Sequence, residues 1–186
     1  MWYSSWMLTV LMIGYTEWGP DTGRSIQEAQ HVQVIQNEIK FSSVKELTNA
    51  SQAIIRATAL EAVQEQATNQ TVQGRKVVKY TQTFQVKATL KGSVGRQVRL
   101  VFYGLEPKPD AGDPLNLQYP GALGDGEYFL FLKKMDSNTF TTVEKWQGIY
   151  PVFSGKTVAL EGSGISELNG LTPNQMMDKI KQVTRQ

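Results

Sequence analysis

The chain has 186 residues, a length that fits one domain with short tails. It contains no Cys and a single His, which excludes disulfides, thiolate metal sites, cysteine nucleophiles and zinc sites that need two histidines. The formal net charge is +2 and 40% of the residues are hydrophobic. The composition therefore supports one apolar core, and the bulk charge indicates no particular partner.

Residues 1–20 resemble a signal segment. Residues 6–14 form a mostly apolar run that is too short to span a bilayer, which takes about 20 residues, and that has the length of a signal-peptide core. No basic residue precedes this run, no A-x-A cleavage pattern follows it, and Tyr15 stands where a lipoprotein signal has its lipidated Cys. We expect an exported or cell-surface bacterial protein with an atypical signal and no transmembrane span. The alternative is an apolar element that packs on the domain.

Residues 21–42 form a polar, Gln-rich lead-in, and the folded domain is expected to cover residues 43–186. Ser43 followed by Glu46 is a capping-box pattern, which predicts a short helix. Residues 50–65 fit two structures. Their Ala, Glu and Gln content and the helical spacing of their apolar residues favour a helix, whereas the segment that begins at Ala53 could open a buried strand. The residues alone leave both alternatives open.

A change to a two-residue period marks the start of a predicted sheet. Apolar and polar side chains alternate from Val78 to Lys91, with Gln82 as the one break in the apolar row. This pattern predicts a long half-buried strand. A short Gly-containing turn follows, and residues 97–102 alternate in the same way. So short a connection predicts an antiparallel pair.

The second half of the chain predicts further strands and a closing helix. Residues 104–126 form a long connection with four prolines, through which no sheet is expected to run. Thr172, Pro173 and Gln175 form a capping box for a C-terminal helix. Strands are predicted at residues 127–132, which are apolar on both faces, at 139–144, and as a hairpin of 150–153 with 156–160.

Several short motifs resemble a domain found in poorly characterised exported proteins and lipoproteins of Gram-positive bacteria. They are residues 80–86, 90–92, 126–132 and 147–150. That domain is in turn similar to the OB-type barrel of tissue inhibitors of metalloproteinases and netrin-like modules. The resemblance covers residues 43–183 and implies a mainly β fold, namely a five-stranded antiparallel OB-like barrel with flanking short helices. It also implies that residues 53–63 form the first strand.

The animal inhibitors bind a protease zinc through an N-terminal Cys, which this chain lacks. No functional residue therefore transfers by resemblance, and only the architecture does. The barrel core is expected to bury Phe84, Val86, Leu100, Leu130 and Leu132.

Charge segregation is the strongest functional feature of the sequence. Residues 75–108 contain eight basic residues and one acid. A basic outward sheet face could bind a polyanion, and the alternative is that its lysines only keep a strand surface soluble. Strand parity predicts that the outward set contains Lys79, Lys87, Lys91, Arg99 and Tyr103.

The connection over residues 104–126 adds apolar side chains to this candidate site. Long connections in compact domains are usually functional or disordered. Its leucines and tyrosine either pack the connection onto the barrel as a lid or form an exposed apolar patch rimmed by charge. The candidate contact residues are Leu115, Leu117 and Tyr119.

The sequence thus predicts a non-enzymatic exported domain that binds an unknown protein or an anionic polymer at the cell envelope, without cofactor or metal. His31, the only candidate base of a Ser-His-Asp site, lies in the polar lead-in. Asp110, Asp113 and Asp125 fit no calcium motif. One alternative is a hydrolase with carboxylates that the sequence does not identify. The other is a nucleic-acid-binding OB domain, which is disfavoured because only Tyr103 among the sheet aromatics points outward.

Overall fold

The computed structural model describes residues 40–160 and 162–185, which belong to the second of two units into which the chain divides, Asn37–Gln186. The signal-like segment, His31 and the lead-in before residue 40 lie outside the described residues. No helix in the described part of the chain is long and apolar enough to cross a membrane.

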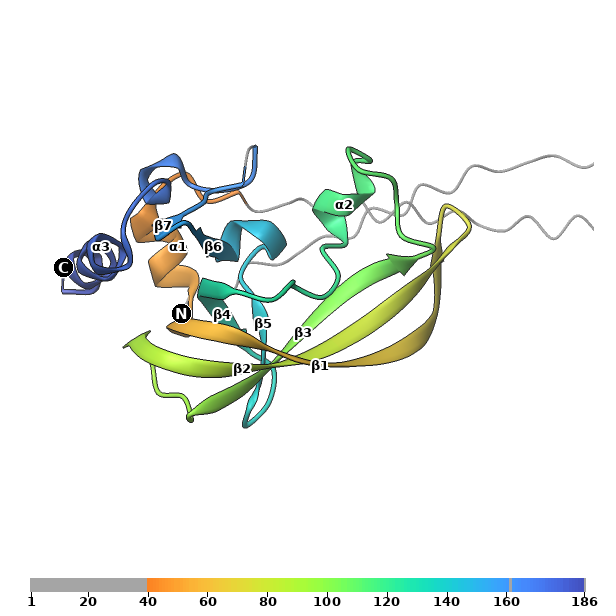
Figure 1. The fold of residues 1–186 in the computed structure, drawn as a ribbon, viewed down its shortest axis with the longest axis horizontal. Helices are drawn as coiled ribbons and strands as arrows, with labels where there is room; N and C mark the ends of the chain where they lie inside the picture. Colours follow the sequence, from red (N-terminus) through yellow and green to blue (C-terminus); the bar gives the residue numbers. More distant parts are fainter. Residues whose placement is uncertain (1–39, 161, 186) are drawn as a thin grey trace, which may run out of the picture. The chain divides into compact units, whose positions relative to one another are not determined.

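Strands dominate this unit, so the predicted mainly β fold is confirmed (Figure 1). In chain order the elements are α1 (Val44–Ala50), β1 (Ala53–Val72), β2 (Arg75–Lys91), β3 (Gln97–Glu106), α2 (Leu115–Gln118), β4 (Glu127–Lys134), β5 (Thr139–Thr142), η1 (Lys145–Gly148), β6 (Ile149–Phe153), β7 (Lys156–Thr157), η2 (Ser166–Leu168) and α3 (Pro173–Thr184).

The seven strands form one sheet in the order β1-β2-β3-β5-β4-β6-β7, and an additional pairing joins β1 to β4. The strands β1 to β5 therefore close into a ring in which each has a neighbour on both sides. β3 and β5 run parallel, so the ring is not antiparallel throughout as predicted, and the other pairs are antiparallel. A ring of this kind leaves few strand edges unpaired, which suits short apolar strands.

β1 decides between the two structures that the sequence left open for residues 50–65. Ile54 and Ile55 are both fully buried, but they belong to different apolar clusters. Successive residues of a strand point to opposite faces, so a strand can bury both side chains in separate cores. This packing on two faces outweighs the helical propensity of the local composition.

Two large apolar cores lie on opposite faces of β1 and β4. The core inside the ring includes Ile55, Phe84, Leu100, Leu130 and Leu132. The other lies against α1 and α3 and includes Leu47, Ile54, Phe131, Tyr150, Met176 and Ile180. Because both faces of β4 are covered, its sequence is apolar at successive positions, as a central strand requires.

The helices α1 and α3 begin where their capping patterns predict. The Ser43 hydroxyl accepts a hydrogen bond from the Glu46 backbone N–H, and the Glu46 carboxylate accepts from the backbone N–H and the hydroxyl of Ser42. At α3 both halves of the capping box form between Thr172 and Gln175. This capping box and the burial of Met176 and Ile180 explain why the short helix α3 forms.

Several details of the predicted strands are wrong. Val86 is half-buried, whereas the other four predicted core residues are buried. β3 continues to Glu106, so the connection is shorter than predicted, and it contains the small helix α2. The last predicted strand is reduced to the two residues of β7. The ladder ends there because Pro151 of β6 has no backbone N–H to donate, although its carbonyl still accepts from Val158.

Candidate functional site

The register of β2 and β3 defines one outward face, which we call the β2–β3 face. The apolar side chains of Phe84, Leu100 and Phe102 point into the ring. Alternate residues must then point outward. The outward cross-strand pairs are Lys79 with Tyr103, Thr81 with Val101, Thr83 with Arg99, and Gln85 with Gln97.

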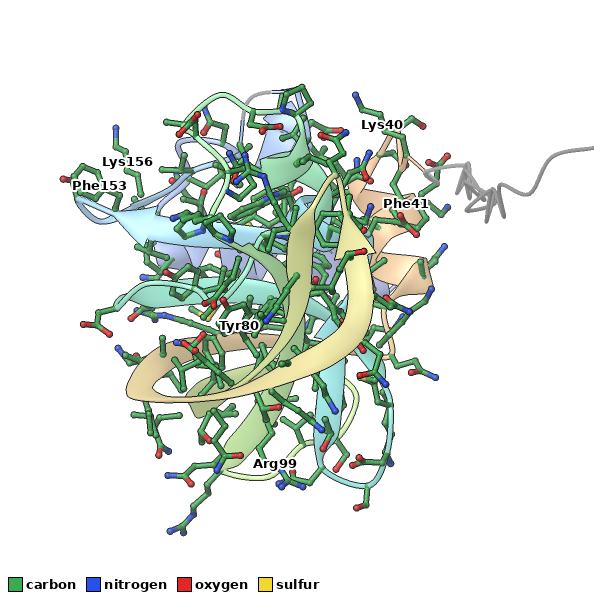
Figure 2. The ribbon with its side chains drawn as sticks, turned by 90° about the vertical axis from the view of Figure 1, so that its right-hand side faces the viewer. Lys40, Phe41, Tyr80, Arg99, Phe153 and Lys156 are labelled. Carbon is green, nitrogen blue, oxygen red and sulfur yellow. The ribbon has the colours of Figure 1, made fainter. Side chains whose placement is uncertain are left out.

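The β2–β3 face carries two cations and no carboxylate at its paired outward positions. Arg99 is exposed, Lys79 is half-buried, and Tyr103 is 42% exposed (Figure 2 labels Arg99). Arg99 and Tyr103 are separated by four strand residues, which is about 13 Å. The pair of Thr81 and Val101 lies between these ends, and Val101 is buried there, while Gln85 and Gln97 lie beyond Arg99. An extended ligand could contact both ends, and a small ion could not.

The nearby acid Asp136 lies outside this face, in the turn between β4 and β5. Asp136 accepts hydrogen bonds from the backbone N–H groups of Asn138 and Thr139, at 3.1 and 2.9 Å. These bonds lower the pKa of Asp136, and the positive charge of Arg99 adds a smaller effect in the same direction. The Asp136 carboxylate is therefore held by its own turn, and no ion pair with Arg99 forms between these described side chains.

Lys87 and Lys91 are occupied by contacts within the fold. The Lys87 Nζ lies 2.6 Å from Glu127 Oε2, and the Arg56 Nε lies 2.6 Å from Glu127 Oε1. The Lys91 Nζ donates to the Thr48 carbonyl at 2.7 Å, near the C-terminus of α1. A cation at a helix C-terminus satisfies carbonyls that lack partners within the helix. Lys87 and Lys91 therefore make contacts within the fold, and Lys79 and Arg99 are the cations left as candidates for ligand binding.

The aromatic residues of β2 and β3 other than Tyr103 face inward. Phe84 and Phe102 meet edge to face in the ring core, with ring centroids 6.4 Å apart. The Tyr80 hydroxyl donates to Glu106 at 3.1 Å. Burial, followed by this contact with Glu106, raises the pKa of Tyr80 to about 12, so its hydroxyl stays a neutral donor.

The connection after β3 runs along the free edge of that strand. Leu115 packs with Val77 and Leu105, while Leu123 enters the ring core. The Gly121 N–H donates to the Tyr103 carbonyl at 3.0 Å. This arrangement covers backbone groups of β3 that have no partner strand beyond β5.

Close approach of this connection depends on Gly104 and Gln82. A Cβ added to Gly104 would lie 2.7 Å from the Tyr80 ring and 3.0 Å from the Gly121 Cα, so a side chain has no room there. The buried Gln82 amide donates to the Leu123 carbonyl at 2.8 Å and accepts from the Leu123 N–H at 3.0 Å. Gln82, the polar residue that interrupts the apolar row of β2, therefore holds the connection in place.

Three predicted contact residues of the connection have different positions. Leu115 is buried and Tyr119 is half-buried against the same cluster, whereas Leu117 is 52% exposed. Leu117 lines a small pocket with a volume of about 120 Å³ rather than the β2–β3 face. Ligand pockets for small molecules usually hold about 300–1,000 Å³, so this pocket is small for such a ligand.

The small pocket contains residues that sequence reasoning did not single out as functional. Glu144 and Lys145 both have left-handed backbone conformations, with φ of 47° and 49°. The Trp146 indole donates to the Asn116 carbonyl at 2.8 Å, and the buried Gln147 amide bonds both backbone groups of Phe41. These contacts fix α2 and the chain before α1 to η1. No local pattern in the sequence predicts these contacts. The left-handed conformations of Glu144 and Lys145 are also not predictable, because they are rare for such residues.

Within residues 40–160 and 162–185, no three His, Cys, Asp or Glu side chains gather in a way that could hold a metal ion. Asp113 instead accepts a hydrogen bond from the Leu115 N–H at 2.9 Å, at the start of α2. Comparison of the chain with known protein families and with curated proteins finds no match.

Proposed function

We propose that the protein is an exported, non-enzymatic binding domain whose β2–β3 face binds an anionic polymer of the cell envelope. The observation that carries the proposal is the composition of that face. Lys79 and Arg99 lie about 13 Å apart, with the Thr81 hydroxyl between them, Thr83 beside Arg99, the amides of Gln85 and Gln97 beyond it, and no carboxylate at the paired outward positions. A polymer with repeated negative charges and hydroxyl groups matches this alternation of cations and neutral hydrogen-bonding groups.

The strand order supports an OB-like barrel as the finer description of the fold. The ring runs β1-β2-β3-β5-β4 and returns to β1, with β3 and β5 parallel. OB barrels bind oligonucleotides and oligosaccharides on the face of their second and third strands. The β2–β3 face lies at the corresponding place, which favours it over the other surfaces of the domain.

Single-stranded nucleic acid is the weaker candidate for the polymer. Binding of single strands uses successive aromatic side chains on which bases stack. Tyr103 is the one aromatic residue at the paired outward positions of β2 and β3. A sugar or polyol phosphate needs hydrogen-bonding groups and cations, which this face supplies.

The test measures binding of polyglycerol phosphate to the full chain and to the double variant Lys79→Gln/Arg99→Gln. We expect the double variant to bind about tenfold or more weakly, because each cation near an anionic surface contributes about 1 kcal/mol. Binding by the unchanged protein should weaken as salt rises, since exposed charges are screened.

The matched control is Lys45→Gln/Lys181→Gln, which removes two exposed cations from α1 and α3. Its affinity should stay close to that of the unchanged protein. An equal loss in both double variants would contradict a localised site. Stronger binding of oligothymidylate than of polyglycerol phosphate would favour the nucleic-acid alternative.

A further inference from the structure

β1 extends well beyond the ring and has a neighbour on only one side there. Its pairing with β4 ends at Thr58, and the Ala59 N–H makes the last bond on that side, to the Gly126 carbonyl. From residue 60 to Val72, β1 pairs with β2 alone (Figure 1). In the described part of the chain, no other strand covers this outer edge.

The hydrogen-bond pattern shows which backbone groups of this edge are free. The Val86 N–H bonds the Arg96 carbonyl, so even-numbered residues of β2 turn their backbone groups toward β3 and odd-numbered ones toward β1. Lys79 is odd-numbered and pairs with Gln66 of β1. The backbone of Gln66 is thus used within the sheet. Its neighbours Glu65 and Ala67 direct their N–H and C=O groups outward.

This edge is only partly protected against pairing with another strand. Natural edges carry charged residues or Pro, contain bulges, are very short, or are covered. Residues 60–72 contain no Lys, Arg or Pro, and residues 64–67 are exposed. Bulges occur at Ala59/Val63 and Ala67/Thr71, and between them residues 63–67 keep an unbroken register. Between the bulges the edge is exposed and regular, and Glu65 is its one charged residue, which favours addition of a further strand there.

We propose that this edge pairs with the same edge of a second copy of the chain, antiparallel, about a two-fold axis at Gln66. An isologous contact of this kind satisfies the same free groups on both copies. A register centred on Gln66 places Glu65 opposite Ala67 of the other copy. A register centred on Glu65 would place two carboxylates directly opposite each other, which is destabilising.

The dimer would also join two binding faces. Gln66 lies on the same face as its partner Lys79, and directly opposed residues of antiparallel strands point to the same side. The β2–β3 faces of both copies would therefore lie on one side of a continuous sheet. This consequence rests on the proposed function, and it would let one polymer occupy two faces at once with increased avidity. The pairing itself requires no ligand.

The absence of Cys from the chain allows a specific crosslinking test. In the full-length variant Gln66→Cys, the two Cys Cα atoms would lie about 4.5 Å apart, as in non-hydrogen-bonded pairs, within the range that a disulfide spans. The matched control Gln64→Cys lies on the same face and is also exposed. Its Cα atoms would be about 13 Å or more apart in this register. We expect mild oxidation to give disulfide dimers of Gln66→Cys and few of Gln64→Cys.

Sedimentation equilibrium of the unchanged full chain, without polyanion, should show a monomer–dimer equilibrium over an about hundredfold concentration range. Gln66→Lys should shift it toward monomer, because it places like charges opposite each other at the axis. Circular dichroism should show that this variant stays folded. A monomer at every concentration, equal crosslinking of both Cys variants, or a dimer unaffected by Gln66→Lys would each overturn the proposal. None of these results depends on polymer binding, so failure of the proposed function would be seen separately.

Discussion

Glu127 joins three strands through its side chain. It binds Arg56 of β1 and Lys87 of β2 from the first position of β4, each at 2.6 Å. Partial burial raises the pKa of Glu127, but the hydrogen bonds from the two cations outweigh this effect, so the pKa lies below its ordinary value of 4.5. A carboxylate with a lowered pKa stabilises the folded state at neutral pH and loses this contribution as the pH falls through its folded-state pKa.

Glu127→Gln should therefore change how stability depends on pH. At neutral pH we expect a loss of about 1 kcal/mol, since the pair is partly exposed. The free energies of unfolding of the variant and the unchanged protein should converge as the pH falls below 4.5. Urea unfolding at several pH values measures this difference.

The control for this experiment is Glu167→Gln, which removes an exposed carboxylate that lies 2.7 Å from Lys179. Exposed ion pairs contribute little, so its stability should change by less than about 0.5 kcal/mol. A constant difference between Glu127→Gln and the unchanged protein from neutral to acid pH would contradict the role assigned to Glu127.

The sequence predicted on which side of β2 each lysine lies, but not which residue each lysine contacts. Strand parity placed Lys79 and Lys87 on the outward side of β2. It could not show that Lys87 meets Glu127, because that contact depends on the pairing of β1 with both β2 and β4. Charge counted along the chain therefore overstated the number of cations that a ligand could use.

Among the elements, the connection between β3 and β4 depends most on contacts distant in sequence. Its α2 helix has only four residues and buries Leu115 against Val77 and Leu105. So short a helix has no stability of its own, so these contacts determine its position. The caps of α1 and α3 are local, and for that reason the sequence predicted them well.

Replacing Gln82 by Ala should release the connection from the ring. The change removes both partners of the Leu123 backbone groups, and each buried group left without a partner costs about 1–3 kcal/mol. We expect lower stability in urea unfolding and faster hydrogen exchange of the Leu123 amide. Thr83→Ala, one residue along on the opposite face, should change stability by only about 0.5 kcal/mol. Unchanged exchange at Leu123 in Gln82→Ala would show that this amide does not hold the connection.

For the whole molecule, the sequence predicted the mainly β class and most strands, because a two-residue period reports half-buried strands directly. No single segment of the sequence predicts that five strands close into a ring. It requires Ala53–Thr58 to pair with β4 on one side and β2 on the other. The long arm of β1 was not predicted, since Gln and Thr in residues 64–72 lack apolar alternation.

Binding of an anionic polymer by the β2–β3 face can be mapped residue by residue. We expect NMR titration of the labelled full chain with polyglycerol phosphate to shift the amide signals of Lys79, Thr83, Arg99 and Tyr103, and added salt to reverse these shifts. The signals of α1 and α3 should stay in place. Shifts confined to the helices, or no shifts while Lys79→Gln/Arg99→Gln still binds the polymer fully, would contradict the claim.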